Sequence, residues 1–452
     1  MKIKLSDHFT YKKLIQFVLP SIAMMIFTSI YGVVDGFFVS NYAGKTEFAA
    51  VNLIMPFPMM LGAFGFMVGT GGSALVAIAL GEGKKKEANE YFSMLIYVTI
   101  VVGAILSVLG IVFTRRIAIW LGASDDMLEY CVIYGRWLLV ALTPFMLQNV
   151  FQSFLVTAEK PQMGLIVTVA AGLTNVVLDF VFIGLLHGGV VGAALATGIS
   201  QFVGGVIPLI YFMKKNTSLL RLVKAKVNWS VLGKTCFNGS SELMTNLSLS
   251  LVNMLYNVQL MKFAGENGVA AYGVIMYVNF IFIAVYIGYA IGSAPIIGYH
   301  YGAGNQDEMK NVFGKSIRFN VAAGVIMTVV AILMSGVLAG IFVGYDAQLC
   351  DMTQRGFAIY SLSFLIMGVN IYGSSFFTAL GNGLVSAFIS FLRTLLFQLI
   401  AVLVLPIFFE LDGIWMSIVV AEAVALIVTI GFLWEIKRSM VINSELKWDR
   451  IG

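Results

Sequence analysis

The sequence predicts an all-α polytopic membrane protein of twelve transmembrane helices, built as two six-helix repeats with pseudo-two-fold symmetry. Two observations lead to this fold class: the composition and an internal repeat. Of the 452 residues, 59% are hydrophobic and 11% are charged, whereas a soluble domain carries about 25% charged residues. A helix needs about 20 apolar residues to cross the hydrocarbon layer. Runs of this length follow one another along the whole chain, separated by short loops.

The apolar runs define the expected helices to within a few residues at each end. The predicted helices are 14–40, 50–80, 91–113, 130–157, 162–186, 191–213, 231–261, 268–299, 315–343, 353–380, 384–408 and 412–436. No connection between them is long enough for a soluble domain. A cytosolic enzyme fused to a membrane anchor is therefore excluded.

The chain repeats itself at an offset of 221 residues. AAVNLIM at 49–55 matches AAYGVIM at 270–276, and GEGKKKE at 81–87 matches GAGNQDE at 302–308. Gly71 matches Gly292 at the same offset. The basic connection between the sixth and seventh helices then joins an N-terminal half, 1–220, to a C-terminal half, 221–452.

An even number of helices in each half predicts parallel repeats, related by an axis along the membrane normal. Transporters of this design bind their substrate between the halves and rock one half against the other.

The Lys and Arg residues predict the orientation, because short cytoplasmic loops are enriched in both. With the N-terminus in the cytoplasm, 21 of them fall on the inner side and six outside or near it, with Arg393 inside a predicted helix. Both termini are therefore predicted to be cytoplasmic. The net charge of +5 follows from this bias and does not indicate nucleic-acid binding. The first apolar run is long and lacks a small-residue cleavage site, so no cleavable signal peptide is expected.

Two acids lie inside apolar runs in the first half. Asp35 and Asp179 both lie in the outer parts of outward-running helices, and a carboxylate near the centre of a membrane helix costs about 2.5–3.5 kcal/mol on insertion scales. Tyr31 and Asn175 each precede one of these acids by four residues and share its helix face. Thr197 lies near the outer end of the following helix. We expect the five side chains to converge on one pocket that binds a proton or another cation.

Other interpretations of these residues remain. The acids could make structural hydrogen bonds or contact lipid headgroups. Taken alone, Tyr31 fits an interfacial tyrosine and Thr197 a threonine bonded to its own helix backbone.

The second half carries different charges. Glu242 and Glu422 are both predicted near the membrane midplane, and Arg393 lies at a similar depth. A structural pair between Glu422 and Arg393 is the favoured interpretation. Glu242 has no obvious cationic partner and is the better functional candidate. The offset places Asp35 opposite Tyr256, so the titrating chemistry is expected to differ between the halves.

Neutral amides form a further set of candidates. Gln148, Asn149 and Gln152 lie together in the fourth helix, and Asn370 is their counterpart in the second half. Amides of this kind can bind a substrate without fixing its charge, or they can form interhelical hydrogen bonds.

No catalytic or metal site is expected. The three His residues are scattered, and the three Cys residues are isolated and read as small buried hydrophobes. GEGKKK lacks the Ser/Thr and the preceding strand of a phosphate-binding loop. An intramembrane enzyme is therefore the weakest of the alternatives, and no cofactor is expected beyond a coupling ion.

The chain resembles the multidrug and toxin extrusion (MATE) transporters over nearly its whole length. The resemblance is carried by five stretches: VVDGFFVS, TAEKP, NVVLDFVFIG, SSELMTNLS and YHYGAGN. It differs from the family pattern in two places, with Phe180 where Pro is usual and Glu159 where Gly is usual.

The resemblance implies a bacterial multidrug antiporter of the inner membrane. It implies that Asp35 binds the coupling cation, with Tyr31, Asn175, Asp179 and Thr197 as partners, and that Glu242 is the acidic residue of the seventh helix linked to coupling or drug charge. The expected protein is a multi-pass monomer that exports amphipathic, mainly cationic drugs or toxins by alternating access, coupled to H⁺ or Na⁺. The alternatives are a flippase for lipid-linked sugars, which would be expected to show about fourteen spans and a cationic cavity, or the export of an endogenous metabolite.

Overall fold

Helices make up all the regular secondary structure in the described part of the chain, residues 3–42 and 45–448 of this computed structural model. The N-terminal half contains α1 (Tyr11–Tyr42), α2 (Lys45–Ile54), α3 (Pro56–Gly81), α4 (Lys85–Trp120), α5 (Asp125–Val140), α6 (Leu142–Thr157), α7 (Pro161–Asp179), η1 (Phe180–Leu185) and α8 (Gly189–Met213). The C-terminal half contains α9 (Trp229–Asn238), α10 (Ser240–Gly302), α11 (Gln306–Val343), α12 (Ala347–Ser361), α13 (Phe364–Ala379), α14 (Gly383–Phe391), η2 (Leu392–Leu396) and α15 (Phe397–Trp448).

The apolar helices account for twelve membrane crossings in the described residues. Eight segments are long and apolar enough to span a membrane, and two bent pairs, α5 with α6 and α12 with α13, bring the number to ten. Two of the ten, Ser240–Gly302 and Gly383–Ile436, are far longer than one crossing needs. The backbone of α10 breaks at Gly265 (φ 62°) and that of α15 at Glu410 (φ 49°). Each of these two therefore crosses twice.

The helices coincide with the predicted runs, but several extend beyond them: α4 begins six residues before 91 and ends seven after 113, and α11 begins nine residues before 315. The predicted helix 50–80 is divided where Pro56 begins α3, as expected for a residue whose ring fits only the first turn of a helix. The predicted helix 231–261 is divided at Gly239, between α9 and α10. In the second half, four helices begin with a capping side chain that accepts a backbone N–H: Asn228, Asn305, Asp346 and Asn382.

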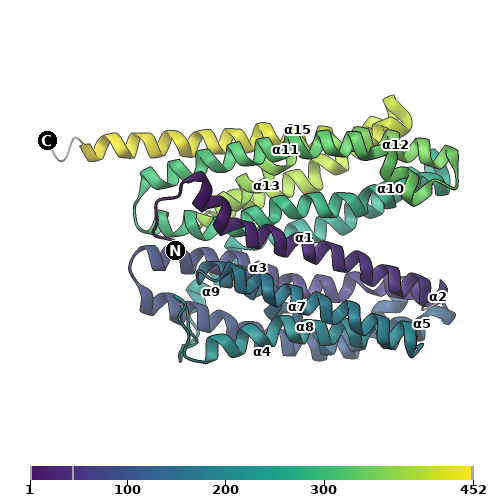
Figure 1. The fold of residues 1–452 in the computed structure, drawn as a ribbon, viewed down its shortest axis with the longest axis horizontal. Helices are drawn as coiled ribbons and strands as arrows, with labels where there is room; N and C mark the ends of the chain where they lie inside the picture. Colours follow the sequence, from purple (N-terminus) through teal and green to yellow (C-terminus); the bar gives the residue numbers. More distant parts are fainter. Residues whose placement is uncertain (1–2, 43–44, 449–452) are drawn as a thin grey trace.

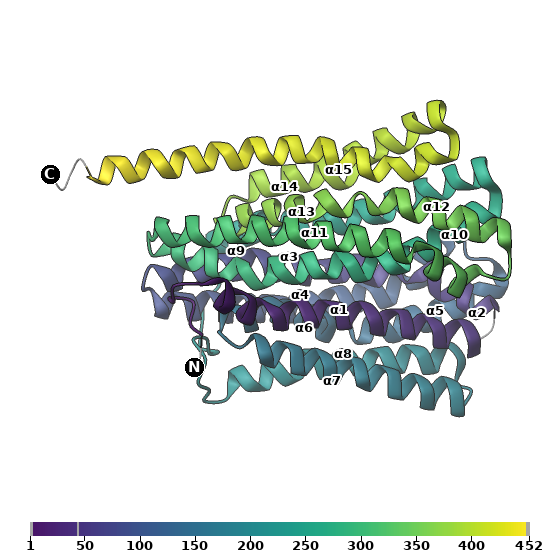
Figure 2. The ribbon, with the colours of Figure 1, turned by 45° about the horizontal axis from the view of Figure 1, so that its top comes forward.

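The helices form two bundles that lie side by side (Figure 1). In the turned view, α7 and α8 lie at one edge of the molecule and α15 at the opposite edge (Figure 2). The first and last helices, α1 and α15, have their terminal ends at the same end of the molecule. Between the bundles, α1 and α3 pack against α10, as the equivalent-helix contact of parallel repeats predicts.

Glycines make close contacts between the halves, and these contacts occur in pairs related by the offset of 221 residues. A side chain at Gly71 would overlap the backbone of Gly239, and one at Gly292 would press on Val18. Positions 18 and 239, like 71 and 292, differ by 221. In the same way Gly81 meets Tyr299, and Gly302 meets Ile78.

Ala77 meets Gly298, its own equivalent, and therefore lies on the pseudo-two-fold axis. The sequence offset of 221 is thus confirmed as a spatial symmetry. A further sequence match at the same offset, Ala43-Gly44 with Ala264-Gly265, lies partly outside the described residues.

The N-terminal segment before α1 crosses from one half to the other. The Leu5 N–H donates to Glu159 Oε1 in the α6–α7 turn at 2.8 Å. The Phe9 N–H donates to Glu308 Oε1 in α11 at 2.8 Å, and His8 Nδ1 lies 2.6 Å from Glu308 Oε2. Leu5 and Phe9 are fully buried. We call residues 3–10 the N-terminal latch.

The latch explains one departure from the family pattern. Glu159 has a φ of 59°, a left-handed conformation in which Gly is favoured. The corresponding turn after α13 has Gly381 at a φ of 76°. At Glu159 the strained conformation places a carboxylate where it holds the latch.

Candidate functional site

The first half brings Asp35 and Thr197 together across two helices. Asp35 lies in the outer part of α1 and is partly buried, and Thr197 lies eight residues into α8. The Thr197 hydroxyl donates to Asp35 Oδ1 at 3.4 Å. The two residues are 162 positions apart in the chain, so the fold, and not local sequence, creates this contact.

Asp179 and Asn175 complete the centre of the site. Asp179, the last residue of α7, is 0% exposed, and Asn175, one turn earlier, is 1% exposed. Both side chains are near enough to Asp35 to interact with its carboxyl group. Neither Asp179 oxygen has a hydrogen-bond partner within the described residues. A buried carboxyl group without a partner is rare in proteins, and this one faces a second carboxyl group.

Tyr31 and the amides of α6 border the same site. The Tyr31 side chain interacts with Gln148 and with Asp35. Gly172 of α7 provides room for Tyr31, because a side chain at Gly172 would overlap its ring. Gln148, Asn149 and Gln152 are all buried, with 4–6% of their surface exposed. The five predicted residues of the first half are therefore close together, and Gln148 joins them.

Sequence reasoning missed two features of this site. Tyr134 of α5 is fully buried, its hydroxyl has no hydrogen-bond partner in the described residues, and it interacts electrostatically with both acids. After Asp179 the helix widens to a π-helix at Phe180–Leu185. Such widened turns occur frequently at functional sites. The polar tyrosine inside an apolar run was the available signal for Tyr134, whereas the sequence carries no clear signal for the π-helix.

In the second half, Glu422 is paired. Its Oε1 lies 3.7 Å from Arg393 Nε, and the Asn370 amide donates to its Oε2 at 2.7 Å and to its backbone carbonyl at 2.9 Å. Glu422 is 1% exposed. The predicted pair of Glu422 and Arg393 is confirmed, and it includes Asn370, which was predicted as a substrate candidate.

Glu242 also has a cationic neighbour, which the sequence did not reveal. It lies in the first turn of α10, is partly buried and interacts electrostatically with Arg393. Arg393 belongs to the π-helix η2, and its Nη1 is buried without a hydrogen-bond partner in the described residues. One arginine therefore acts on both acids of the second half.

Within residues 3–42 and 45–448, no group of three or more His, Cys, Asp or Glu residues could hold a metal ion. The charged groups of the candidate site inside the membrane-spanning helices are two acids in the first half and an arginine with two acids in the second. Ionisable residues at this depth mark ion and substrate pathways in membrane proteins.

Fold and site together define a polytopic transporter built from two parallel six-helix repeats. The family model described as MatE matches residues 20–181 and 243–404, once in each half. The chain belongs to this family, MATE, and is a membrane transporter and not an enzyme.

The chain is similar over its whole length to curated exporters. It is 26% identical to the multidrug export protein MepA of Staphylococcus haemolyticus, covering 96% of this chain and 95% of the relative. Its identity to MepA of Staphylococcus aureus strain MSSA476 is 22%, covering 96% of each.

Solved structures share the fold. An outward-facing multidrug resistance MATE family transporter matches with a TM-score of 0.90 at 23% identity, covering 97% of this chain and 98% of that one. A MOP superfamily transporter from Pyrococcus furiosus matches with a TM-score of 0.87 at 23% identity, covering 95% and 96%.

Proposed function

We propose that this chain is a cation-coupled multidrug antiporter of the bacterial inner membrane that exports amphipathic, mainly cationic compounds by alternating access. The observation that carries the proposal is the pair of neighbouring carboxyl groups inside the first bundle, Asp35, which is partly buried, and Asp179, which is fully buried. The curated relatives are named as multidrug export proteins, which supports the substrate class.

The coupling site in this proposal is Asp35 and Asp179, with Asn175, Tyr31 and Thr197 as polar partners. Two adjacent carboxyl groups repel each other when both are charged, so binding one cation relieves the repulsion. Binding of H⁺ or Na⁺ then favours collapse of the pocket and a shift of α1, which expels the drug outward. Return to the inward-open state releases the cation. A charge moving down a potential of 100 mV supplies about 2.3 kcal/mol.

H⁺ is the favoured coupling ion. The buried acid of the second half, Glu422, is already neutralised by Arg393 at 3.7 Å. Arg393 also acts on Glu242, so the second half offers no unpaired acid pair for a sodium ion, and the coupling chemistry is left to the first half.

The two halves, 1–220 and 221–452, act as the moving bodies in this proposal. Glu242 and the amides Gln148, Asn149, Gln152 and Asn370 are the candidates for contact with drugs. The transporter works as a monomer with both termini in the cytoplasm, consistent with the common end of α1 and α15 (Figure 1).

The test uses the purified protein in liposomes. An imposed proton gradient is expected to drive export of a fluorescent cationic dye, and a sodium gradient of the same size is expected to drive much less. If sodium alone drives export, the ion assignment is wrong. If neither gradient moves the dye, but a lipid-linked sugar crosses the bilayer, the alternative function as a flippase replaces this one.

A further inference from the structure

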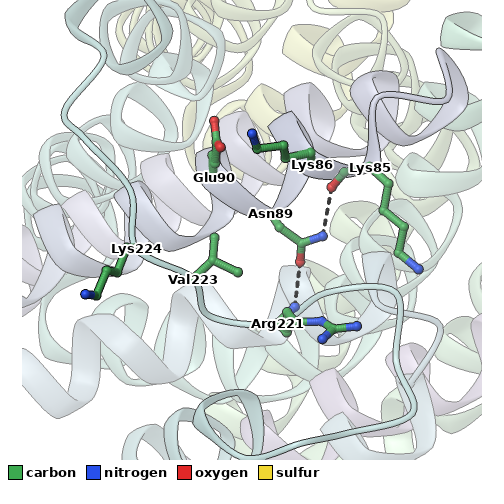
Figure 3. Close-up of a pocket in the computed structure, with 7 residues that line it drawn as sticks. All are labelled: Lys85, Lys86, Asn89, Glu90, Arg221, Val223 and Lys224. Atoms are coloured by element: carbon green, nitrogen blue, oxygen red, sulfur yellow. Dashed lines mark hydrogen bonds between the residues drawn. The ribbon is translucent and has the colours of Figure 1, made fainter.

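A basic pocket of about 470 Å³ lies between the start of α4 and the connection from α8 to α9. Its charged lining consists of Lys85, Lys86 and Glu90 from α4 and Arg221 and Lys224 from the connection. In Figure 3, Lys85 and Arg221 project on the same side of Asn89, and Lys224 lies across the pocket from them. Four cations and one carboxylate give the pocket a strongly positive potential.

The connection is fixed in place, so the pocket is a built feature. The Arg221 N–H donates to Asn89 Oδ1 at 2.7 Å, and the Val223 N–H donates to Ser93 Oγ at 2.8 Å. The Asn89 amide in turn donates to the Lys85 carbonyl at 2.8 Å. Asn89 and Ser93 are 6% and 0% exposed. Buried polar side chains of α4 therefore hold the backbone that presents Arg221 and Lys224.

The pocket continues into an apolar surface of α4. Tyr97, Val101, Ile105 and Val108 are 41–62% exposed, and their spacing of three or four residues places them on one helix face. Lys86 and Glu90 lie 11 and 7 residues before Tyr97 and share this face. Tyr97 donates its hydroxyl to the Val223 carbonyl at 3.1 Å. A positive pocket at a helix end thus opens onto a stripe that faces the hydrocarbon.

We propose that this pocket binds the phosphodiester headgroup of an anionic glycerophospholipid, with an acyl chain along the Tyr97 stripe. Basic pockets between helices at a membrane surface are suited to phosphate-bearing headgroups. The single carboxylate, Glu90, accepts hydrogen bonds from headgroup hydroxyls and disfavours a phosphate dianion. The lipid rests against the connection between the two halves, where it stabilises the position of one half relative to the other.

The experiment measures lipid binding to the full-length protein. Native mass spectrometry is performed after exchange into mixed phosphatidylglycerol–phosphatidylcholine nanodiscs, for wild type and for the double variant Arg221→Gln/Lys224→Gln. The control, Lys214→Gln/Lys215→Gln, removes the same charge from the same connection outside the pocket. Each cation near an anionic headgroup contributes about fivefold in affinity, so the double variant is expected to bind phosphatidylglycerol about thirtyfold more weakly.

The proposal is supported if the control variant keeps its bound phosphatidylglycerol and the pocket variant loses it. Equal binding of phosphatidylglycerol by both variants overturns the proposal. A second arm distinguishes the source of the phosphate. Inorganic phosphate and glycerol phosphate are titrated onto lipid-depleted protein, and neither is expected to bind in the millimolar range or to displace phosphatidylglycerol. Displacement by either one shows a site for soluble phosphate and overturns the lipid assignment. Circular dichroism of the pocket variant and the control variant, whose substituted residues are exposed, confirms that both fold.

Discussion

Asp35 and Asp179 are expected to act as one unit. Because the Asp179 side chain acts on the Asp35 carboxyl group, a cation bound by one changes the affinity of the other. Asp35→Asn and Asp179→Asn are each expected to lower gradient-driven dye efflux by about 5- to 150-fold, the range of a coupling free energy of about 1–3 kcal/mol. In efflux from liposomes, the double variant is expected to be no more impaired than the more impaired of the two single variants. A double variant impaired by the product of the two single effects would show independent sites.

Arg393 is expected to be essential for stability because of the acid that it neutralises. Removing one partner of a buried ion pair costs about 3–5 kcal/mol, since the other charge is left unpaired. Arg393→Met should therefore lower the thermal unfolding temperature in detergent, and adding Glu422→Gln should restore part of it, because Glu242 still lacks its cation. Arg136→Met, an exposed arginine, is the control and should change little. A double variant as unstable as Arg393→Met would contradict the pairing argument.

At the scale of elements, the N-terminal latch joins the two halves at the end of the molecule that holds α1's first residue. For this end to open, the bond from Leu5 to Glu159 or those from the latch to Glu308 must break. A hydrogen bond to a charged group contributes about 1.5–3 kcal/mol. Glu159→Gly removes the carboxylate and also relieves the backbone strain at a φ of 59°. It is therefore expected to favour opening at this end without unfolding the protein.

The latch prediction is measured as a distance between spin labels at Lys84 and Ala303, one on each half near the latch. Glu159→Gly should increase the population with the longer distance. Glu159→Gln retains the acceptor oxygen for Leu5 and serves as the control. Identical distance distributions for the glycine variant and wild type would mean that the latch does not hold the halves.

Glycine packing between α3 and α10 gives a matched pair of variants. Gly81 and Gly302 make pseudo-symmetric contacts with the opposite half, and forcing a methyl group into a packed contact costs about 1–3 kcal/mol. Gly81→Ala and Gly302→Ala are expected to widen the same spin-label distance by similar amounts. Gly314→Ala is the control, because nothing lies within 4 Å of its added carbon. Opposite or unequal shifts would contradict the symmetry.

The elements also show what sequence could and could not predict. The helix limits and the offset of 221 could be predicted, because apolar run length and glycine spacing are local properties. The latch could not, since its contacts join residues 154 and 300 positions apart. The π-helix after Asp179 could not be predicted either. A proline at position 180, where the family pattern usually has one, would have indicated a distortion, but this chain has Phe180 there. The electrostatic interaction of Arg393 with Glu242 depends on how α10 and η2 pack, which no local pattern encodes.

At the scale of the whole molecule, the two halves share a backbone design but carry different charges. The offset places Tyr256 opposite Asp35, and Tyr256 is buried with a hydroxyl that lacks a partner in the described residues. Parallel repeats provide the symmetric rocking that alternating access needs. In the proposed mechanism, the asymmetric charges restrict cation binding to the first half, and Arg393 balances the acids of the second. This division of roles is the central claim of the proposed mechanism.

The most direct test of that claim is substrate-driven proton movement in liposomes that contain a pH-sensitive dye. Wild-type protein is expected to move protons against the direction of drug transport. Asp35→Asn/Asp179→Asn is expected to move protons about 5- to 150-fold more slowly, while still binding the drug. Glu242→Gln, which alters only the second half, is expected to keep proton coupling and to change the preference between cationic and neutral drugs. Proton movement at the wild-type rate in the double aspartate variant, or its loss in Glu242→Gln alone, contradicts the assignment of coupling to the first half.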